Sequence, residues 1–164
     1  MDGDRSAFAG RRGLWYKRGM SDPFEETTEA DVQALLNPVE ARVLGALMEK
    51  QLATPDQYPL TLSSLVAACN QKSNRVPVMQ LATDAVEATL SGLRRVQKLA
   101  VLVHEAGARV PKFRQELTQV FGLNEVEQAV MAELMLRGPQ TLAELRARVP
   151  RMVPAMGEDA VEAA

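Results

Sequence analysis

Three short blocks of this sequence occur twice in the same order, and this repeat restricts the possible folds more than any other feature. The paired blocks are LNPVEARVLGALMEK (36–50) with LNEVEQAVMAELMLR (123–137), TLSSL (61–65) with TLAEL (141–145), and DAVEA (84–88) with DAVEA (159–163). The number of residues that separates the two members of a pair decreases from the first pair to the third, so the loops between the blocks are longer in the first copy. The simplest explanation is one small fold used twice.

The repeated blocks carry the signals of helices. A side chain that can cap a helix precedes each predicted start, and in most cases a Glu follows it three residues later. These caps are Asn37 with Glu40, Asn124 with Glu127, Thr141 with Glu144, and Thr61. Apolar residues recur at helical spacing behind each cap. The core-facing residues of the third helix, which starts after Thr83, are predicted to be Val86, Leu90, Leu93 and Val96.

The pattern changes after the third helix. LAVLVHE (99–105) is short and rich in β-branched residues, AGA (106–108) supplies a glycine turn, and RVPKFRQ (109–115) alternates charged and apolar residues. This arrangement predicts a β-hairpin. Because Pro111 cannot donate a backbone hydrogen bond, its strand is expected at the edge of the sheet.

Three helices followed by a hairpin are typical of a winged helix. We therefore expect a mainly α-helical (α+β) protein with a small β-hairpin wing, built as a tandem winged helix-turn-helix. Residues 36–120 form the first domain, and residues 121–164 form a second, incomplete domain whose wing is missing. Either the sequence is a fragment or a partner covers the face left open. Residues 1–35 lack periodicity, which predicts a disordered or partly helical extension, and Met20 is a candidate for the natural start.

Composition excludes several classes of protein. The chain has 164 residues, of which 46% are hydrophobic and 24% charged, as in soluble globular proteins. No apolar run is long enough to span a bilayer, and the N-terminus has no secretory signal. The lone Cys69 cannot form an internal disulfide, which fits the cytoplasm. We expect no enzyme and no cofactor, because the lone His104 and Cys69 lie far apart in sequence and no phosphate loop or metal-ligand cluster is present.

Positive charge is concentrated in the middle of the chain. Residues 70–114 carry eight Lys or Arg and three Asp or Glu, although the whole chain has a net charge of −2. The candidate DNA-binding residues are the polar turn Asn70, Gln71, Lys72, Asn74 and Arg75, the end of the third helix with Arg94, Arg95 and Lys98, and the wing with Arg109, Lys112 and Arg114. Cations and amides of this kind bind phosphate oxygens.

Each part of this candidate site also has a structural interpretation. The turn can be a helix C-terminus, where amides bond free carbonyls and cations meet the negative end of the dipole. The wing can be a solvated strand that its charges protect from aggregation. Tyr58 is expected to pack against the helices with its hydroxyl in water, although its proline-rich loop can also serve as a binding surface. Asp84 and Glu87 would repel phosphates at the start of the third helix, so backbone contact is favoured over base reading.

Two longer motifs resemble those of a known family. EARVLGALMEKQLATPDQYPL (40–60) and ACNQKSNRVPVM (68–79) are similar to the opening of the bacterial YceH-like proteins, whose function is not established. The similarity continues through ARVPKF (108–113) and RGPQTLAELRAR (137–148), and covers residues 36–164. The resemblance implies a tandem winged-helix protein that forms a homodimer, and it supplies no mechanism.

Two functions follow as hypotheses. The first is a cytoplasmic DNA-binding protein that regulates transcription and contacts mainly the phosphate backbone. The alternative is a protein–protein interaction adaptor that does not bind DNA, since winged helices serve both purposes. A continuous positive band over the turn, the third helix and the wing favours DNA, whereas an apolar patch there favours a protein partner. Membrane binding is not expected.

Overall fold

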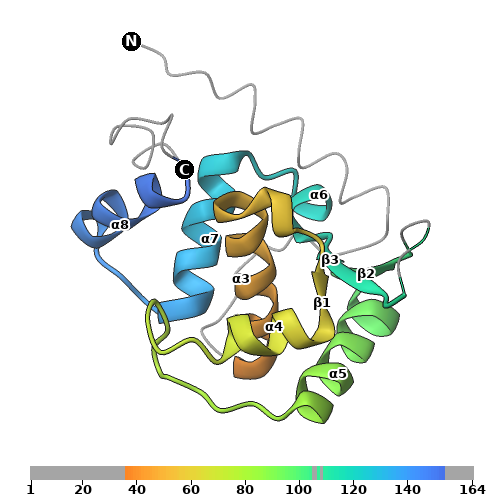
Figure 1. Ribbon diagram of the computed structural model, residues 1–164. Helices are drawn as coiled ribbons and strands as arrows, with labels where there is room; N and C mark the ends of the chain where they lie inside the picture. Colours follow the sequence, from red (N-terminus) through yellow and green to blue (C-terminus); the bar gives the residue numbers. More distant parts are fainter. Residues whose placement is uncertain (1–35, 105–106, 108, 154–164) are drawn as a thin grey trace. The chain divides into compact units, whose positions relative to one another are not determined.

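The computed structural model describes residues 36–104, 107 and 109–153 (Figure 1). The described residues from Pro38 onward form one compact unit. The predictions for residues 1–35, including the start at Met20, and for the second DAVEA block at 159–163 lie outside the described residues. Within the described part, no helix is both long enough and apolar enough to cross a membrane.

The described chain is mainly helical. Its α-helices are α3 (Pro38–Ala53), α4 (Leu62–Cys69), α5 (Thr83–Gly92), α6 (Leu117–Phe121), α7 (Glu125–Arg137) and α8 (Leu142–Arg148), with short 3₁₀ turns at Pro55–Gln57 and Val149–Arg151. Three of the predicted caps are confirmed: the side chains of Thr61, Asn124 and Thr141 accept backbone N–H bonds, and the last two form full capping boxes. The sequence signals therefore locate these helix starts to within one residue.

A small antiparallel sheet packs beside the helices. Its strands are β1 (Leu60–Thr61), β2 (Ala100–Val103) and β3 (Lys112–Gln115), in the order β1-β3-β2. The predicted hairpin is confirmed, with Gly107 at a φ of 82° in the connection between β2 and β3. The edge prediction is wrong, because the two-residue strand β1 pairs with the other side of β3 and makes it the central strand. Pro111 is tolerated since it lies just before β3, outside the ladder.

Tyr58 ties the loop before β1 to the hairpin. Its hydroxyl accepts a hydrogen bond of 2.8 Å from the backbone N–H of Gln115, whereas the sequence predicted a hydroxyl in water. Tyr58 is half-buried, and burial raises its pKa to about 12. The aromatic residue is therefore part of the packing, as expected, and it also fixes β1 against β3.

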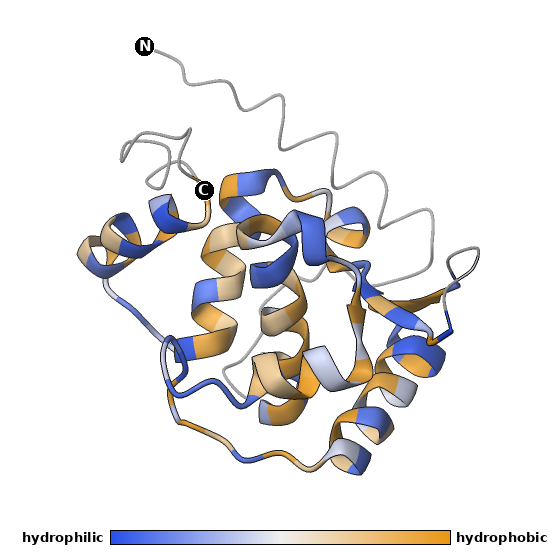
Figure 2. Ribbon diagram, in the orientation of Figure 1, coloured by the Kyte–Doolittle hydropathy of each residue, from blue (hydrophilic) through white to orange (hydrophobic). Residues whose placement is uncertain are grey.

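The two copies of the first repeated block share one core. Every residue of α3 from Arg42 to Glu49 is buried. α7 runs antiparallel to α3: Gln128, near the start of α7, donates to the Met48 carbonyl at 3.2 Å, and Arg42, near the start of α3, donates to the carbonyl of Leu136. Figure 1 shows the two helices side by side, and Figure 2 shows their hydrophobic faces in the middle of the unit.

Close approach of α3 and α7 depends on one glycine. A Cβ placed on Gly45 would lie 2.9 Å from the Cβ of Met135 and 3.1 Å from the Cγ of Leu136. Real Cβ atoms do not approach this closely, so Gly45 allows the helices to cross at a short distance. Residues from the two repeats thus pack as directly as residues within one domain.

α5 ends in a π-helical turn, η2 (Leu93–Gln97), that corrects one sequence prediction. Val86, Leu90 and Leu93 are buried as predicted, but Val96 is 80% exposed. A π turn closes its hydrogen bonds one residue later than an α turn, which rotates the following side chains. The regular helical spacing therefore fails at Val96, and the residue faces solvent with its charged neighbours.

Candidate nucleic-acid interface

The polar turn at the end of α4 is closed by its own side chains. Asn70 donates from Nδ2 to the Leu81 carbonyl at 2.9 Å, and its Oδ1 accepts from the Leu81 N–H at 2.7 Å. These two bonds join the ends of the connection between α4 and α5. We call this connection, residues 70–82, the strap.

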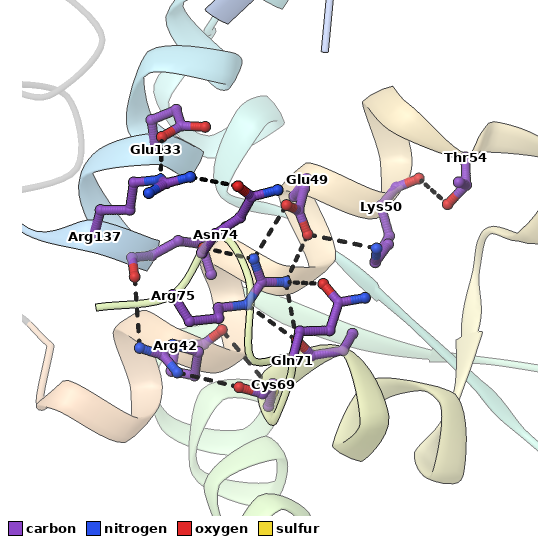
Figure 3. A network of polar contacts seen from close by, with 12 residues as sticks. Arg42, Glu49, Lys50, Thr54, Cys69, Gln71, Asn74, Arg75, Glu133 and Arg137 are labelled. Atoms are coloured by element: carbon purple, nitrogen blue, oxygen red, sulfur yellow. Dashed lines mark hydrogen bonds and ion pairs between the residues drawn. The ribbon is translucent and has the colours of Figure 1, made fainter. Parts of the chain in front are cut away.

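Arg75 anchors the strap in the core. Its side chain is completely buried and forms two hydrogen bonds, of 3.1 and 2.6 Å, with the carboxylate of Glu49 in α3. Further donors bind the carbonyls of Ala68 and Asn74 and the side chain of Gln71. The guanidinium is thus engaged on every side by the protein itself (Figure 3).

A second buried cation lies where two helices end. Arg42 donates to the carbonyl of Cys69 at 3.1 Å and to the carbonyl of Leu136 at 3.5 Å, at the C-terminal ends of α4 and α7. It also donates to the strap at the Pro77 carbonyl, at 2.7 Å. Burial, and next the nearby charge of Arg75, lower the pKa of Arg42. Carbonyls at helix C-terminal ends favour a cation, which explains how the charge is accommodated.

α7 holds the strap directly. The N–H of Val76 donates to the Leu136 carbonyl at 2.9 Å, and Arg137 donates to the side chain of Asn74. Arg137 also pairs with Glu133 at 3.0 Å within α7. Asn74 has a φ of 57°, which turns the strap toward α7.

These contacts change the role of the polar turn. Asn70, Asn74 and Arg75, which the sequence suggested for phosphate contact, are used to hold the strap against α3 and α7. Gln71 accepts from Arg75, while Lys72 is exposed. The structural interpretation of the turn is therefore the better one for Asn70, Asn74 and Arg75.

The remaining candidate cations lie in the turn that follows α5 and in the hairpin. Arg95 and Lys98 are exposed and Arg94 is half-buried. The turn that carries them is fixed in place: Gln97 donates to Glu40 of α3 at 3.2 Å, and the Leu99 N–H donates to the Leu93 carbonyl at 2.9 Å. We call residues 93–98 the cationic turn.

The hairpin supplies three more cations in different settings. Arg109 is exposed near the tip, and Lys112 is half-buried. Arg114 is exposed but pairs with Glu116 at 2.7 Å. His104, the residue directly after β2, is exposed. In Figure 1 the first part of the strap lies at the left of the view, beside the lower end of α7, whereas the hairpin lies at the right.

No group of three or more His, Cys, Asp or Glu among the described residues could hold a metal ion. Cys69 is buried, and burial raises the pKa of its thiol to about 12. A thiol in this state is a core residue and a poor nucleophile.

Arg42 and Glu49 are important residues that the sequence interpretation did not single out. Both lie in the first repeated block, whose second copy has Ala129 and Leu136 at the corresponding positions. When the two copies are aligned, a charged residue in one copy stands where the other copy has an apolar residue, and this difference is the signal that could have identified Arg42 and Glu49.

Comparisons with known proteins agree with the resemblance noted in the sequence. A UPF0502 protein of Geobacter sulfurreducens is 52% identical over 131 residues, which make up 80% of this chain and 59% of the relative. A UPF0502 protein of Cellvibrio japonicus is 47% identical over 134 residues, or 82% of this chain and 60% of the relative. The chain thus spans about 60% of the length of these curated relatives. Because a family model also matches residues 36–164, the chain belongs to the bacterial family described as "Protein of unknown function, DUF480".

Proposed function

We propose that this protein is a cytoplasmic winged-helix protein that binds duplex DNA through its phosphate backbone and, as a homodimer, regulates transcription. The DNA would lie across the cationic turn and the hairpin. Base reading is not part of the proposal, because the exposed residues Asp84 and Glu87 would repel DNA from the first half of α5.

The winged-helix assignment is supported by the order of the elements. Helix α3 is followed by β1, by α4 and α5, and then by the hairpin β2–β3, with β1 on the outer side of β3. In the second repeat, α7 and α8 correspond to α3 and α4. α5 and the hairpin are the elements that winged helices use against DNA.

One observation carries the DNA proposal: cations gather on the cationic turn and the hairpin with little negative charge among them. Residues 93–115 carry six Lys or Arg and one Glu. Among the described residues, none lies within ion-pair distance of Arg95, Lys98 or Arg109. Exposed cations without a protein partner release counterions from DNA when they bind phosphates.

The test is a fluorescence anisotropy titration of labelled random duplex at about 50 and about 200 mM salt. The variant carries Arg95→Gln, Lys98→Gln and Arg109→Gln together. Each lost phosphate contact should lower the slope of log K against log salt by about 0.9, so the triple variant should lower it by about 2.7. Light scattering of the same samples gives the oligomeric state.

Arg151→Gln is the matched control, because Arg151 is an exposed arginine in the second repeat. It should leave affinity and slope unchanged. The proposal fails if the wild-type chain does not bind duplex at about 50 mM salt, or if the triple variant keeps the wild-type slope.

A second candidate function, a protein interaction adaptor, is favoured by two exposed valines, one in the cationic turn and one in the hairpin. Val96 is 80% and Val110 is 55% exposed, each beside exposed cations. Apolar groups rimmed by charge are common where proteins meet. Val96→Ser with Val110→Ser separates the two functions: it should leave DNA binding intact if phosphate contacts dominate, and it should abolish binding to a protein partner if the valines are the contact.

A further inference from the structure

The strap is unusual because its hydrogen bonds come from both repeats. α3 of the first repeat supplies Arg42 and Glu49, and α7 of the second repeat supplies the Leu136 carbonyl and Arg137. Figure 3 shows these side chains gathered around Asn74 and Arg75. A connection of this length with no helix or strand of its own would otherwise be mobile.

The strap also determines where α5 begins. The paired bonds between Asn70 and Leu81 close the strap immediately before Thr83, the first residue of α5. The first turn of α5 then follows directly, with the Val86 N–H donating to the Ala82 carbonyl at 3.2 Å. At its other end α5 continues without interruption into the cationic turn.

The end of α7 is in turn connected to α8. Gly138, with a φ of 79°, ends α7, and Gln140 donates back to the Glu133 carbonyl at 3.0 Å. Glu133 pairs with Arg137, which donates to Asn74 of the strap. These contacts, two hydrogen bonds and an ion pair, link the segment between α7 and α8 to the strap by way of Glu133 and Arg137.

We infer that the strap couples the second repeat to α5, so that a change at the C-terminal end of α7 alters the order and position of the helix that carries the cationic turn. The coupling itself does not depend on what the cationic turn binds. Its consequence, control of DNA binding by the second repeat, rests on the function proposed above.

Hydrogen exchange tests the coupling without DNA. Arg137→Ala removes the donor to Asn74, and Asn74→Gly removes the acceptor while keeping a residue that tolerates the positive φ. Each variant should speed exchange of the amides of Val76, Leu81 and Val86 by about tenfold, as expected for the loss of a charge-assisted bond. Amides in the middle of α3 should be unchanged.

Two further variants test whether a change in the exchange of the strap amides comes from the contact between Arg137 and Asn74. Arg114→Ala is the control, because it breaks an ion pair of similar length on β3 that touches neither α7 nor the strap. It should leave the strap amides unchanged. The double variant of Arg137 and Asn74 should exchange no faster than Arg137→Ala alone, since Asn74→Gly removes a contact that Arg137→Ala has already removed. Asn74→Gly keeps the pair between Arg137 and Glu133, so it remains informative if Arg137→Ala destabilises the whole fold.

The inference is overturned if the strap amides are unaffected by either variant, or if they exchange faster while Val86 does not. A DNA titration gives a separate result. In a chain that binds duplex, Asn74→Gly should weaken binding about fivefold without changing the salt slope, because no phosphate contact is lost. If the wild-type chain binds no duplex, the proposed function fails, while the exchange experiment still decides whether the strap couples the repeats.

Discussion

Replacing Glu49 with Gln removes the carboxylate that pairs with Arg75 and keeps the size of the side chain. The side chain of Arg75 is 0% exposed and that of Glu49 is 10% exposed, so water cannot replace the lost charge. The guanidinium would keep its bonds to the Ala68 and Asn74 carbonyls and to Gln71, and it would remain a buried charge near Arg42.

Breaking a buried pair by removing one partner typically costs 3–5 kcal/mol, and the surviving bonds place Glu49→Gln at the lower end, at about 3 kcal/mol. For a chain of this size, each kcal/mol lowers Tm by about 2–4 °C, so a decrease of about 6–12 °C is expected. Thermal unfolding followed by circular dichroism, together with urea unfolding, measures both quantities.

Glu144→Gln is the matched control for this experiment. Glu144 pairs with Arg148 at 3.2 Å on the surface of α8, and Gln can keep its place in the capping box with Thr141. Its Tm should stay close to that of the wild type, since exposed pairs contribute little. Equal effects of the two substitutions would refute the claim that the strap is held by a buried charge.

Four further predictions follow from the packing. Gly45→Ala should destabilise the protein by about 1–3 kcal/mol in urea unfolding, because its Cβ would collide with α7, whereas Gly92→Ala, which has open space around it, should stabilise α5 by up to about 1 kcal/mol. Tyr58→Phe should cost about 1–2 kcal/mol by leaving a strand N–H without its acceptor. The pKa of Tyr58 is raised from a usual 10.0 to about 12 in the folded chain, so Tyr58 loses its proton at a lower pH in the unfolded chain than in the folded one. The free energy of unfolding should therefore fall as pH rises from about 10 to 12, and in the folded protein the absorbance of the Tyr58 tyrosinate should appear only near pH 12. Cys69 should react with a thiol reagent only when the chain unfolds, since burial raises its pKa to about 12; rapid labelling of the native protein would contradict this.

Local signals predicted the elements that depend on local chemistry. The caps at Thr61, Asn124 and Thr141 and the hairpin around Gly107 needed only nearby residues, and all of them are found. The strand β1 was missed because two residues carry no periodicity. Its existence depends on pairing with β3, far away in sequence.

The candidate site was harder to predict because burial cannot be read from residue type. Arg75 and Arg95 are both arginines next to polar residues, yet the first is buried against Glu49 and the second is exposed. The difference comes from long-range contacts of the strap with α3 and α7. Val96 was misplaced for a different reason, since the π turn changes the spacing on which the prediction relied.

The differences between the two copies of the first block explain why they are not interchangeable. The apolar residues that the copies share are buried mainly in α3, at Val43, Leu47 and Met48, whereas three of the four buried apolar residues of α7, Ala129, Ala132 and Leu136, stand at positions where the copies differ. The second copy replaces Arg42, Gly45 and Glu49 with Ala, Ala and Leu. In α3, these three positions hold the strap and allow α7 to approach. The positions where the copies differ therefore carry much of the contact between them: in α7 they fill the core, and in α3 they hold the strap and let α7 approach.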